Sequence, residues 1–430
     1  MAEIAVTAPS LRARMRAIFG GAAGNLVEWY DWYAYAAFTL YFAKSFFPQG
    51  DQTSQLLQTA GVFAVGFFAR PVGAWLMGLY ADRAGRRAAL TVSVSMMCFG
   101  SLLIALCPTY AQIGAAAPLL LVAARILQGL SVGGEYGASA TYMSEMAGAR
   151  HRGFWSSFQY VTLIGGQLIA LGVLIVLQNT ITPADLDAWG WRIPFAIGAG
   201  LAVVVFLIRL GMAEAASFEN ARGQERARTM LLFLRYPKEA LMVIGFTAGG
   251  TLAFYAYTTY MQKYLVNTTG FSRDAASAIS AGTLICFMLV QPLYGWISDK
   301  IGRKPMLLAA FGLNALIAYP LFTALSTAKS ESLAFGLALT GLLVNALYTS
   351  VGTVVKAELF PANVRALGVA LPYALATATF GGTAEYVALW FKQAGFEHGF
   401  YLYLSAMSAM AFAVALLMRD TKHKSLIAEL

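Results

Sequence analysis

The sequence predicts an all-α integral membrane protein, with twelve transmembrane helices arranged as two six-helix halves related by pseudo-symmetry. Three observations lead to this prediction. The 430-residue chain is 59% hydrophobic and only 12% charged, against roughly 25% charged residues in soluble domains. Its apolar segments are continuous runs of about 20 residues, the length of helix that crosses a bilayer. Finally, a charged motif and an acidic–basic pair each occur twice, in the same order and at nearly the same offset.

The low charge content excludes a soluble protein, because so apolar a chain could not cover its surface in water. Lipid offers no hydrogen bonds to the backbone, so only helices and closed barrels span it. The apolar runs are long and continuous, whereas barrel strands are short and alternating, and this favours helices. The cysteines lie in or beside apolar runs without the spacing of metal ligands, so we expect neither a metal nor a cofactor. They are Cys98, Cys107 and Cys286.

The basic residues predict the orientation of the chain. Most of the 30 Lys and Arg residues fall in the N-terminal segment, the C-terminal tail and the loops on the same predicted side. Cytoplasmic loops are enriched in Lys and Arg, so we expect both termini on the cytoplasmic side of the membrane. The net charge of +9 follows from this bias and does not indicate a nucleic-acid partner. The first apolar run is long and contains Glu28 and Asp31, so a cleaved signal peptide is not expected.

A hydrophilic connector at 212–238 separates the first six predicted spans from the last six. We expect it to include amphipathic helix at the cytoplasmic surface. The predicted organisation is an N-terminal segment 1–18, a six-helix bundle 19–211, this linker, a second bundle 239–419 and a tail 420–430. The predicted spans are 19–43, 57–81, 88–107, 117–145, 154–179, 191–211, 239–263, 275–298, 305–326, 332–357, 366–392 and 399–419.

The internal repeat is clearest in a ten-residue motif. Residues 78–87 read GLYADRAGRR, and residues 295–304 read GWISDKIGRK, at an offset of 217. Both follow the pattern Gly-x3-Asp-basic-x-Gly-basic-basic. Parallel repeats with a substrate site at mid-membrane between them are a transporter architecture.

A second repeated pair lies close to the first motif in each half. Glu145 precedes Arg152 by seven residues, and Glu358 precedes Arg365 by seven residues, at an offset of 213. These charges can pair across helix ends when the halves close on the inside. The alternative is a set of solvated loop charges that follow the positive-inside rule. We predict a conformational latch made of Gly78, Asp82, Arg83, Gly85, Arg86, Glu145, Arg152, Asp299, Arg303, Glu358 and Arg365.

The motif pair on twelve spans resembles the major facilitator superfamily over the whole chain. The metabolite:proton symporter family is indicated by the segments GNLVEWYD (24–31), RPVG (70–73), RILQGLSVGGEYG (125–137) and WGWRIPF (189–195). Members that carry α-ketoglutarate are the most similar in the segments 58–63, 157–167, 260–267 and 381–388. The resemblance implies a symporter, but other members carry shikimate, citrate or osmolytes such as betaine and proline. A fold does not fix its cargo.

Two carboxylates on the first span are candidates for proton coupling. Glu28 and Asp31 lie three residues apart and hence on one helix face, and Asp31 is expected about 18 Å from the cytoplasmic end of the span. Two buried carboxylates close together cannot both ionise cheaply, so one is expected to hold a proton. The alternative is a structural ion pair with an arginine. Further proton-coupling candidates are Glu135 and Glu385.

Two arginines are candidates for binding the substrate. Arg70 and Arg125 are both predicted inside spans, and a guanidinium group binds a carboxylate through two hydrogen bonds. The alternative is that they only pair with Asp31, Glu28 or Glu135. Neither arginine recurs in the second half, where the offsets place Phe287 and Ala338. Residues that serve the general fold should recur, so this favours a functional role.

Neutral polar side chains complete the predicted site. They could hydrogen-bond a carboxylate or keto oxygen, although helix–helix hydrogen bonding is their commoner use in membranes. Together with the arginines, the predicted substrate-binding residues are Gln128, Tyr160, Gln167, Tyr255 and Gln262.

These features predict a secondary carrier that takes up a dicarboxylate with protons by alternating access, without enzymatic activity and as a monomer. Two negative charges oppose uptake against the membrane potential by about 2.3 kcal/mol per charge per 100 mV, so at least two protons are needed. No Gly-x4-Gly-Lys-Ser/Thr sequence occurs, so ATP is not the expected energy source. A membrane enzyme or a non-transporting sensor is a less favoured alternative. An osmolyte carrier would use an aromatic cage, for which Trp29, Tyr30, Trp32 and Tyr33 are available.

Overall fold

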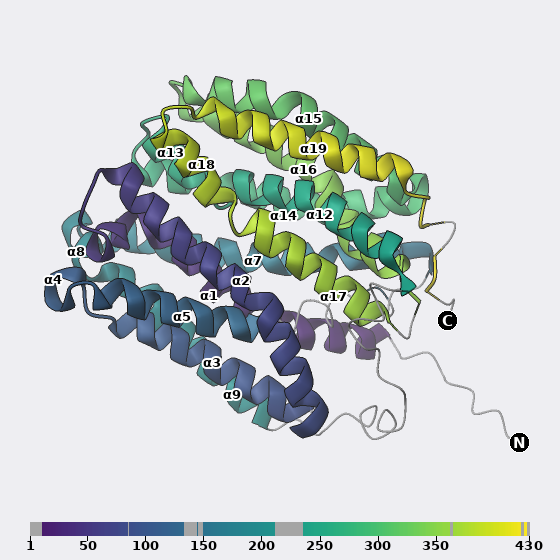
Figure 1. Cartoon of the computed structure of the whole chain (residues 1–430), viewed down its shortest axis with the longest axis horizontal. Coiled ribbons are helices and arrows are strands. Elements are labelled where there is room, and N and C mark those ends of the chain that lie inside the picture. The colour runs from purple at the N-terminus through teal and green to yellow at the C-terminus, as the bar shows by residue number, and fades with distance from the viewer. Residues whose placement is uncertain are drawn as a thin grey trace, which may run out of the picture.

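The computed structural model describes residues 11–84, 86–132, 144, 149–210, 235–361, 364–422 and 425–427, which form helices and no strands (Figure 1). The first half contains α1 (Leu11–Phe46), α2 (Gln52–Ala84), α3 (Arg86–Leu106), α4 (Tyr110–Ile113), α5 (Ala116–Val132), the short 3-10 helix η1 (Ala149–His151), α7 (Arg152–Thr180), α8 (Pro183–Ala188), the short 3-10 helix η2 (Gly190–Arg192) and α9 (Ile193–Leu210). The second half contains α12 (Pro237–Tyr257), α13 (Met261–Asn267), α14 (Arg273–Ile301), α15 (Arg303–Ser326), α16 (Glu331–Glu358), α17 (Arg365–Ala376), the π-helical turn η3 (Thr377–Gly381), α18 (Ala384–Gln393) and α19 (His398–Leu417).

The helices match the predicted spans. Among the described residues, seven helices are long and apolar enough to cross a membrane, and three shorter apolar segments lie in α3, α5 and η2–α9. With α1 and the interrupted helix α17–α18, they correspond one to one to the twelve predicted spans. The predicted multi-pass helical fold is therefore confirmed. Most of the predicted linker 212–238 lies outside the described residues.

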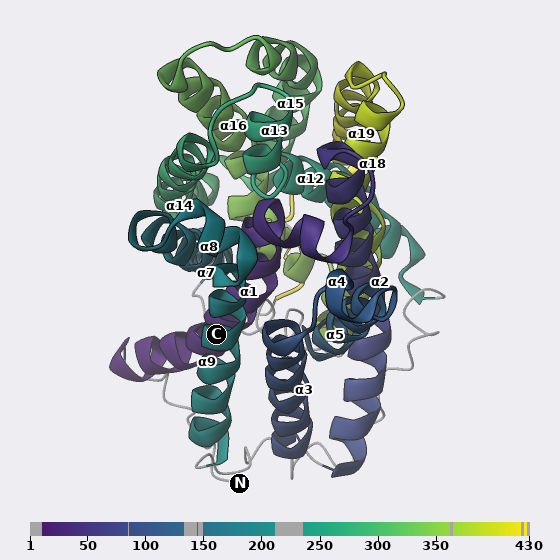
Figure 2. The same ribbon diagram turned by 90° about the vertical axis from the view of Figure 1, so that its left-hand side faces the viewer.

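The two halves repeat the same packing scheme. In the first half α1 packs against α7, α3 against α9, and α5 against both α2 and α3. In the second half α12 packs against α17 and η3, α15 against α19, and α16 against both α14 and α15. Contacts between the halves follow the same symmetry, because α7 packs against α14 and α2 packs against α18. Figures 1 and 2 show the two halves on opposite sides of the molecule. This is the predicted pseudo-symmetry.

Glycines let the helices approach closely at two of these crossings. A β-carbon at Gly129 of α5 would overlap the backbone carbonyl of Gly66 in α2. Where α7 meets α14, a β-carbon on Gly153 would lie 2.6 Å from the carbonyl oxygen of Gly295. Small residues of this kind bring backbones together in membranes, so the second crossing holds the two halves in contact.

Two predicted spans are interrupted. The span predicted at 239–263 is helical to Tyr257, turns, and resumes at Met261. The span predicted at 366–392 contains the π-helical turn η3, in which the amide of Gly382 donates to the carbonyl oxygen of Thr377 at 2.8 Å. Such turns occur frequently at functional sites. Both interruptions lie in the second half, and η3 contacts α2 of the first half.

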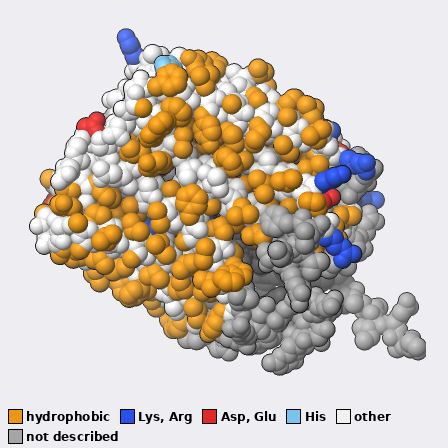
Figure 3. Space-filling view, viewed as in Figure 1, with side chains coloured by type: hydrophobic (Ala, Val, Ile, Leu, Met, Phe, Trp, Pro, Cys, Tyr) orange, Lys and Arg blue, Asp and Glu red, His pale blue; other side chains and the backbone are white. Residues whose placement is uncertain are grey.

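The outer surface is apolar. Leucines of several helices are more than two-thirds exposed, as expected for side chains that face lipid, and include Leu106, Leu119, Leu289, Leu316 and Leu417. Figure 3 shows hydrophobic side chains over most of the visible face, with Lys and Arg side chains gathered near the chain termini. In the described part of the molecule, charge is confined to the ends of the bundle and to a few buried positions.

Candidate functional site

Charged side chains are buried within the spans, where each one costs about 2.5–3.5 kcal/mol on insertion scales. A buried charge therefore requires a partner or a function. The buried charged residues of the described spans, apart from those at helix ends, are Glu28, Asp31, Arg70, Arg125, Lys263, Lys356 and Glu385.

Asp31 lies inside the first half, between four helices. It accepts hydrogen bonds from Ser101 Oγ of α3 and from Gln128 Nε2 of α5, both at 2.5 Å. Gly198 of α9 packs directly against its carboxylate, where any side chain would collide with it. Gln128 also accepts a hydrogen bond from Arg125 Nη1 at 2.8 Å. The side-chain amide of Gln128 thus bridges the carboxylate of Asp31 and the guanidinium group of Arg125.

The two candidate arginines share one aromatic ring. The guanidinium carbons of Arg70 and Arg125 lie 3.8 Å and 3.9 Å from the centroid of the Trp32 ring. Arg70 also lies 4.0 Å from the ring centroid of Phe67, and Arg125 lies 4.5 Å from that of Tyr35. The rings stabilise the buried cations. Both arginines are predicted inside spans from the sequence. The structure brings their guanidinium groups together on the ring of Trp32, a residue of α1.

Each arginine leaves one edge without hydrogen bonds. In the described part of the molecule, Nε and Nη2 of both Arg70 and Arg125 are buried and have no hydrogen-bond partner. These two nitrogens form the edge of a guanidinium group that binds a carboxylate through two parallel bonds. Arg70 is close enough to Tyr255 and Tyr373 of the second half to interact with them electrostatically. The arginines are therefore suited to receive an anion.

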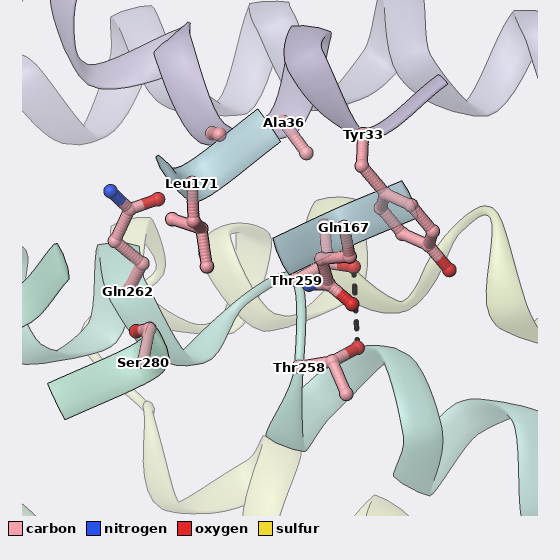
Figure 4. Close-up of a pocket in the computed structure, with 9 residues that line it drawn as sticks. Tyr33, Ala36, Gln167, Leu171, Thr258, Thr259, Gln262 and Ser280 are labelled. Atoms are coloured by element: carbon pink, nitrogen blue, oxygen red, sulfur yellow. Dashed lines mark hydrogen bonds between the residues drawn. The ribbon is translucent and has the colours of Figure 1, made fainter. Parts of the chain in front are cut away.

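A small cavity lies between the halves (Figure 4). Its volume of about 10 Å³ accommodates about one water molecule, so an organic acid would require the halves to separate. Figure 4 shows side chains of α1 and α7 facing those of the interrupted span, with Gln262 and Ser280 at one end. The lining residues are Tyr33, Ala36, Ala37, Gln167, Leu171, Thr258, Thr259, Gln262 and Ser280.

The predicted polar binding residues do not all lie together. Gln167 and Gln262 line the cavity, and Gln262 Nε2 donates to Ser277 Oγ at 3.1 Å. Tyr255 lies beside the cavity and packs its ring against Phe67 across the halves, with the centroids 5.2 Å apart. Tyr160 is buried, 5.8 Å from the ring of Phe254. Gln128 lies away from the cavity, between Asp31 and Arg125.

Glu385 has a partner that the sequence did not reveal. Lys263 Nζ in α13 lies 2.8 Å from Glu385 Oε2 in α18, and both side chains are almost completely buried. The predicted span 239–263 ends at Lys263, which places this lysine at the end of a helix. Because the turn after Tyr257 places α13 inside the bundle, the lysine is buried instead. The signal available in the sequence was a lysine followed by the apolar residues of YLV.

The latch residues of the second half join the two halves at one end of the molecule, the latch end. Asp299 accepts hydrogen bonds from the amides of Gly153 at 2.8 Å and Phe154 at 2.9 Å. It therefore caps the start of α7 from the opposite half, where a negative charge is favoured. Arg303 Nη1 lies 2.9 Å from Asp299, and Glu358 lies 3.7 Å from Arg303.

Two more latch residues lie in the same region. Arg152 Nη1 of α7 lies 3.7 Å from Glu358 across the halves. Arg365 Nε donates to the carbonyl oxygens of Ala357 and Phe360, at the end of α16 and just after it.

Of the remaining predicted latch residues, Gly78 belongs to α2. The other predicted residues lie outside the described part of the chain, either wholly or in their side chains, and are Asp82, Arg83, Gly85, Arg86, Glu145 and the proton-coupling candidate Glu135.

A charge cluster at the opposite end was not predicted. Asp187 of α8 lies 2.8 Å from Lys44 Nζ of α1 and 2.7 Å from Arg273 Nη1 of α14. Lys44 and Asp187 belong to the first half and Arg273 to the second. No sequence pattern indicated it, because all three residues fall in predicted loops between the spans. The described residues thus join the halves at both ends of the molecule.

Known proteins resemble the chain over its whole length. It matches the family described as sugar (and other) transporter at residues 17–240 and again at 212–429. The alpha-ketoglutarate permease of Escherichia coli (strain K12) is 53% identical over 424 residues, with 97% of this chain and 98% of that protein covered. The citrate-proton symporter of Klebsiella pneumoniae is 32% identical, with 89% and 86% covered.

A solved structure of similar fold is the xylose transporter XylE from E. coli, in a partially occluded inward-open conformation. Its TM-score is 0.77, with 96% of this chain and 99% of that chain covered at 21% identity. At this identity the likeness concerns the fold alone. The chain therefore belongs to the sugar (and other) transporter family, within the major facilitator superfamily that its repeated motifs indicated.

Proposed function

We propose that the protein is a carrier for the proton-coupled uptake of α-ketoglutarate, or a close dicarboxylate, by alternating access. The observation that carries this proposal is the pair of buried arginines with unpartnered Nε and Nη2 atoms. Two cations with open bidentate edges at mid-membrane favour an anionic cargo. The 53% identity to an alpha-ketoglutarate permease supports a dicarboxylate in particular.

An osmolyte carrier is less well supported. A zwitterion such as betaine would place its ammonium group on an aromatic face. The Trp32 face is already within 4 Å of two guanidinium groups, and Trp29 lies 5.1 Å from Arg70 and stacks with Tyr33. The protein's own cations thus take the aromatic surface that the ammonium group of a betaine would need, and they would repel that group.

We propose Asp31 as the group that couples the proton. It lies in the span, is 1% exposed, and is one glutamine away from Arg125. Protonation would remove its charge and weaken the pull of the Gln128 amide on it. Gln128 could then turn toward Arg125, so that proton binding changes the arginine that the substrate contacts. Glu28, Glu135 and Glu385 are the remaining candidates.

The charge clusters would serve the conformational cycle. Asp299, Arg303, Glu358 and Arg152 would form a latch that holds the halves together at the latch end, with both termini on the cytoplasmic side of a bacterial inner membrane. Basic residues near the termini support this orientation. The proposed units are the bundles 19–211 and 239–419, joined by the linker 212–238, in a monomer.

Uptake into proteoliposomes tests the proposal. Labelled α-ketoglutarate should accumulate when the outside is acidic, and unlabelled citrate, shikimate and betaine should be added as competitors. We expect unlabelled α-ketoglutarate to compete most strongly and betaine not at all. Accumulation of betaine but not α-ketoglutarate would contradict the proposed cargo, and accumulation without a pH gradient would contradict proton coupling.

A further inference from the structure

Lys263 and Glu385 form a buried ion pair that the packing of the surrounding helices does not require. The two atoms lie 2.8 Å apart, and the side chains are 0% and 5% exposed. The desolvation of such a pair can exceed its Coulombic attraction, so apolar side chains would hold the helices together at least as well. Ionisable residues inside membrane spans generally have a functional role.

The pair lies where the halves meet. The helix α18, which carries Glu385, packs against α2 of the first half, and the ring of Tyr386, the next residue, lies beside Gly61 of α2. Lys263 follows Gln262, which lines the cavity between the halves. The titratable groups of the described chain that interact with Glu385 are Lys263, Tyr35 and Tyr260.

Neither residue recurs in the other half. An offset of 217 takes Lys263 to Phe46, and an offset of 213 takes Glu385 to Gly172. The repeated packing scheme therefore does not need the pair. The pair gives the second half a buried cation. Among the described residues, the cavity-lining side chains of that half are neutral, and both arginines of the proposed site belong to the first half.

We propose that Lys263 is an anion-binding group of the transport site, from which a substrate carboxylate displaces Glu385, and that the displaced Glu385 then takes up a proton. This inference rests on the proposed function and names the second half's contact with the substrate. One carboxylate would be bound by Arg70 and the other by Lys263, so that a dicarboxylate connects the halves.

The exchange is balanced in charge. Before it, the ammonium of Lys263 is paired with the carboxylate of Glu385. Afterwards it is paired with the substrate carboxylate, and Glu385 carries a proton that a hydronium ion of the outside solution has delivered. The O–H bond formed on Glu385 replaces the O–H bond broken in that hydronium ion, which leaves as neutral water. One substrate carboxylate is thus bound together with one proton, and the net charge of the site does not change.

Three purified full-length variants test the proposal. Glu385→Gln leaves Lys263 without an internal anion, and Lys263→Met with Glu385→Gln removes both charges. The matched control is Lys392→Met with Glu397→Gln, which removes a pair 3.3 Å apart in the same half, at its outer end. The measurements are the Kd of α-ketoglutarate and of 2-oxopentanoate, which lacks the second carboxylate, and proton uptake on binding in weakly buffered solution.

We expect Glu385→Gln to bind α-ketoglutarate more tightly than the natural protein and to take up about one proton fewer per substrate. The double variant should lose about 10- to 150-fold of the preference for α-ketoglutarate over 2-oxopentanoate, the effect of one charged hydrogen bond. The control should match the natural protein in both measurements.

Unchanged proton uptake in Glu385→Gln, or an unchanged preference in a folded double variant, would overturn the proposal. If the double variant does not fold, proton uptake by Glu385→Gln decides. A natural protein that does not bind α-ketoglutarate at all overturns the proposed function and this inference together. Normal binding by the natural protein, combined with either unchanged result, overturns the inference alone.

Discussion

Replacing Arg70 by lysine isolates the contribution of the guanidinium edge. Lysine keeps the positive charge, and its ammonium can still lie on the aromatic rings that surround Arg70. It cannot present two parallel donors in one plane, as Nε and Nη2 of Arg70 do. In the structure these are the two buried nitrogens without partners. Arg70→Lys therefore removes one of two expected bonds to a carboxylate and little else.

The magnitude follows from that single bond. A hydrogen bond to a charged group contributes about 1.5–3 kcal/mol, so the Kd of α-ketoglutarate should rise by about 10- to 150-fold. The matched control is Arg192→Lys. Arg192 also stacks on a tryptophan, 4.2 Å from the Trp191 ring, but it donates to the carbonyl oxygens of Ala105 and Cys107 at 3.0 Å and 2.6 Å. The control variant should bind substrate normally.

Isothermal titration of the purified variants measures the change in Kd, and uptake into proteoliposomes at equal protein density measures its effect on transport. A Kd for Arg70→Lys within about twofold of the natural value would refute the reasoning, because it would mean that the edge formed by Nε and Nη2 does not contact the substrate. An equal loss in Arg192→Lys would show that any change of a stacked arginine disturbs the fold.

Three further predictions concern coupling and the ends of the molecule. Asp31→Asn mimics the protonated form, so exchange of substrate across the membrane should persist while accumulation driven by a pH gradient fails; retained accumulation would place coupling elsewhere. Asp299→Ala should weaken the cap on α7 by about 0.5–2 kcal/mol and so let the halves separate more often at the latch end. A cysteine placed at Ser157 of α7 should then react faster with a thiol reagent, and an unchanged rate would count against the latch. Asp187→Asn removes two partly exposed pairs worth about 0.2–1 kcal/mol each, so the same assay at Ser277 should show an increase of about two- to thirtyfold, while no change would mean that this cluster does not hold the halves together.

The sequence predicted the fold well because its strongest signals are physical requirements of the bilayer. The span 154–179, for example, corresponds to α7 at Arg152–Thr180. The interruptions were not predicted because the residues that form them do not break the apolar pattern. The turn between Tyr257 and Met261 consists of threonines and a tyrosine, and η3 consists of TATFG, without proline.

The site was predicted in its residue types but not in its contacts. The depth of Arg70 and Arg125 could be counted along their helices. Their meeting on Trp32 could not, since it depends on how α2 and α5 cross α1. The same limit applies to Gln128, which was expected to contact substrate and whose amide lies between Asp31 and Arg125. Its role in binding stays a prediction.

The contact of both arginines with Trp32 also makes this ring an optical probe of the site. The excited state of an indole is sensitive to nearby charge, and two guanidinium carbons lie within 4 Å of this one. An anion that draws either cation away from the ring should shift the fluorescence of the protein. The chain has 8 tryptophans, so the difference between the natural protein and Trp32→Phe gives the signal of this ring. Occupancy of the site could then be followed in real time without a label.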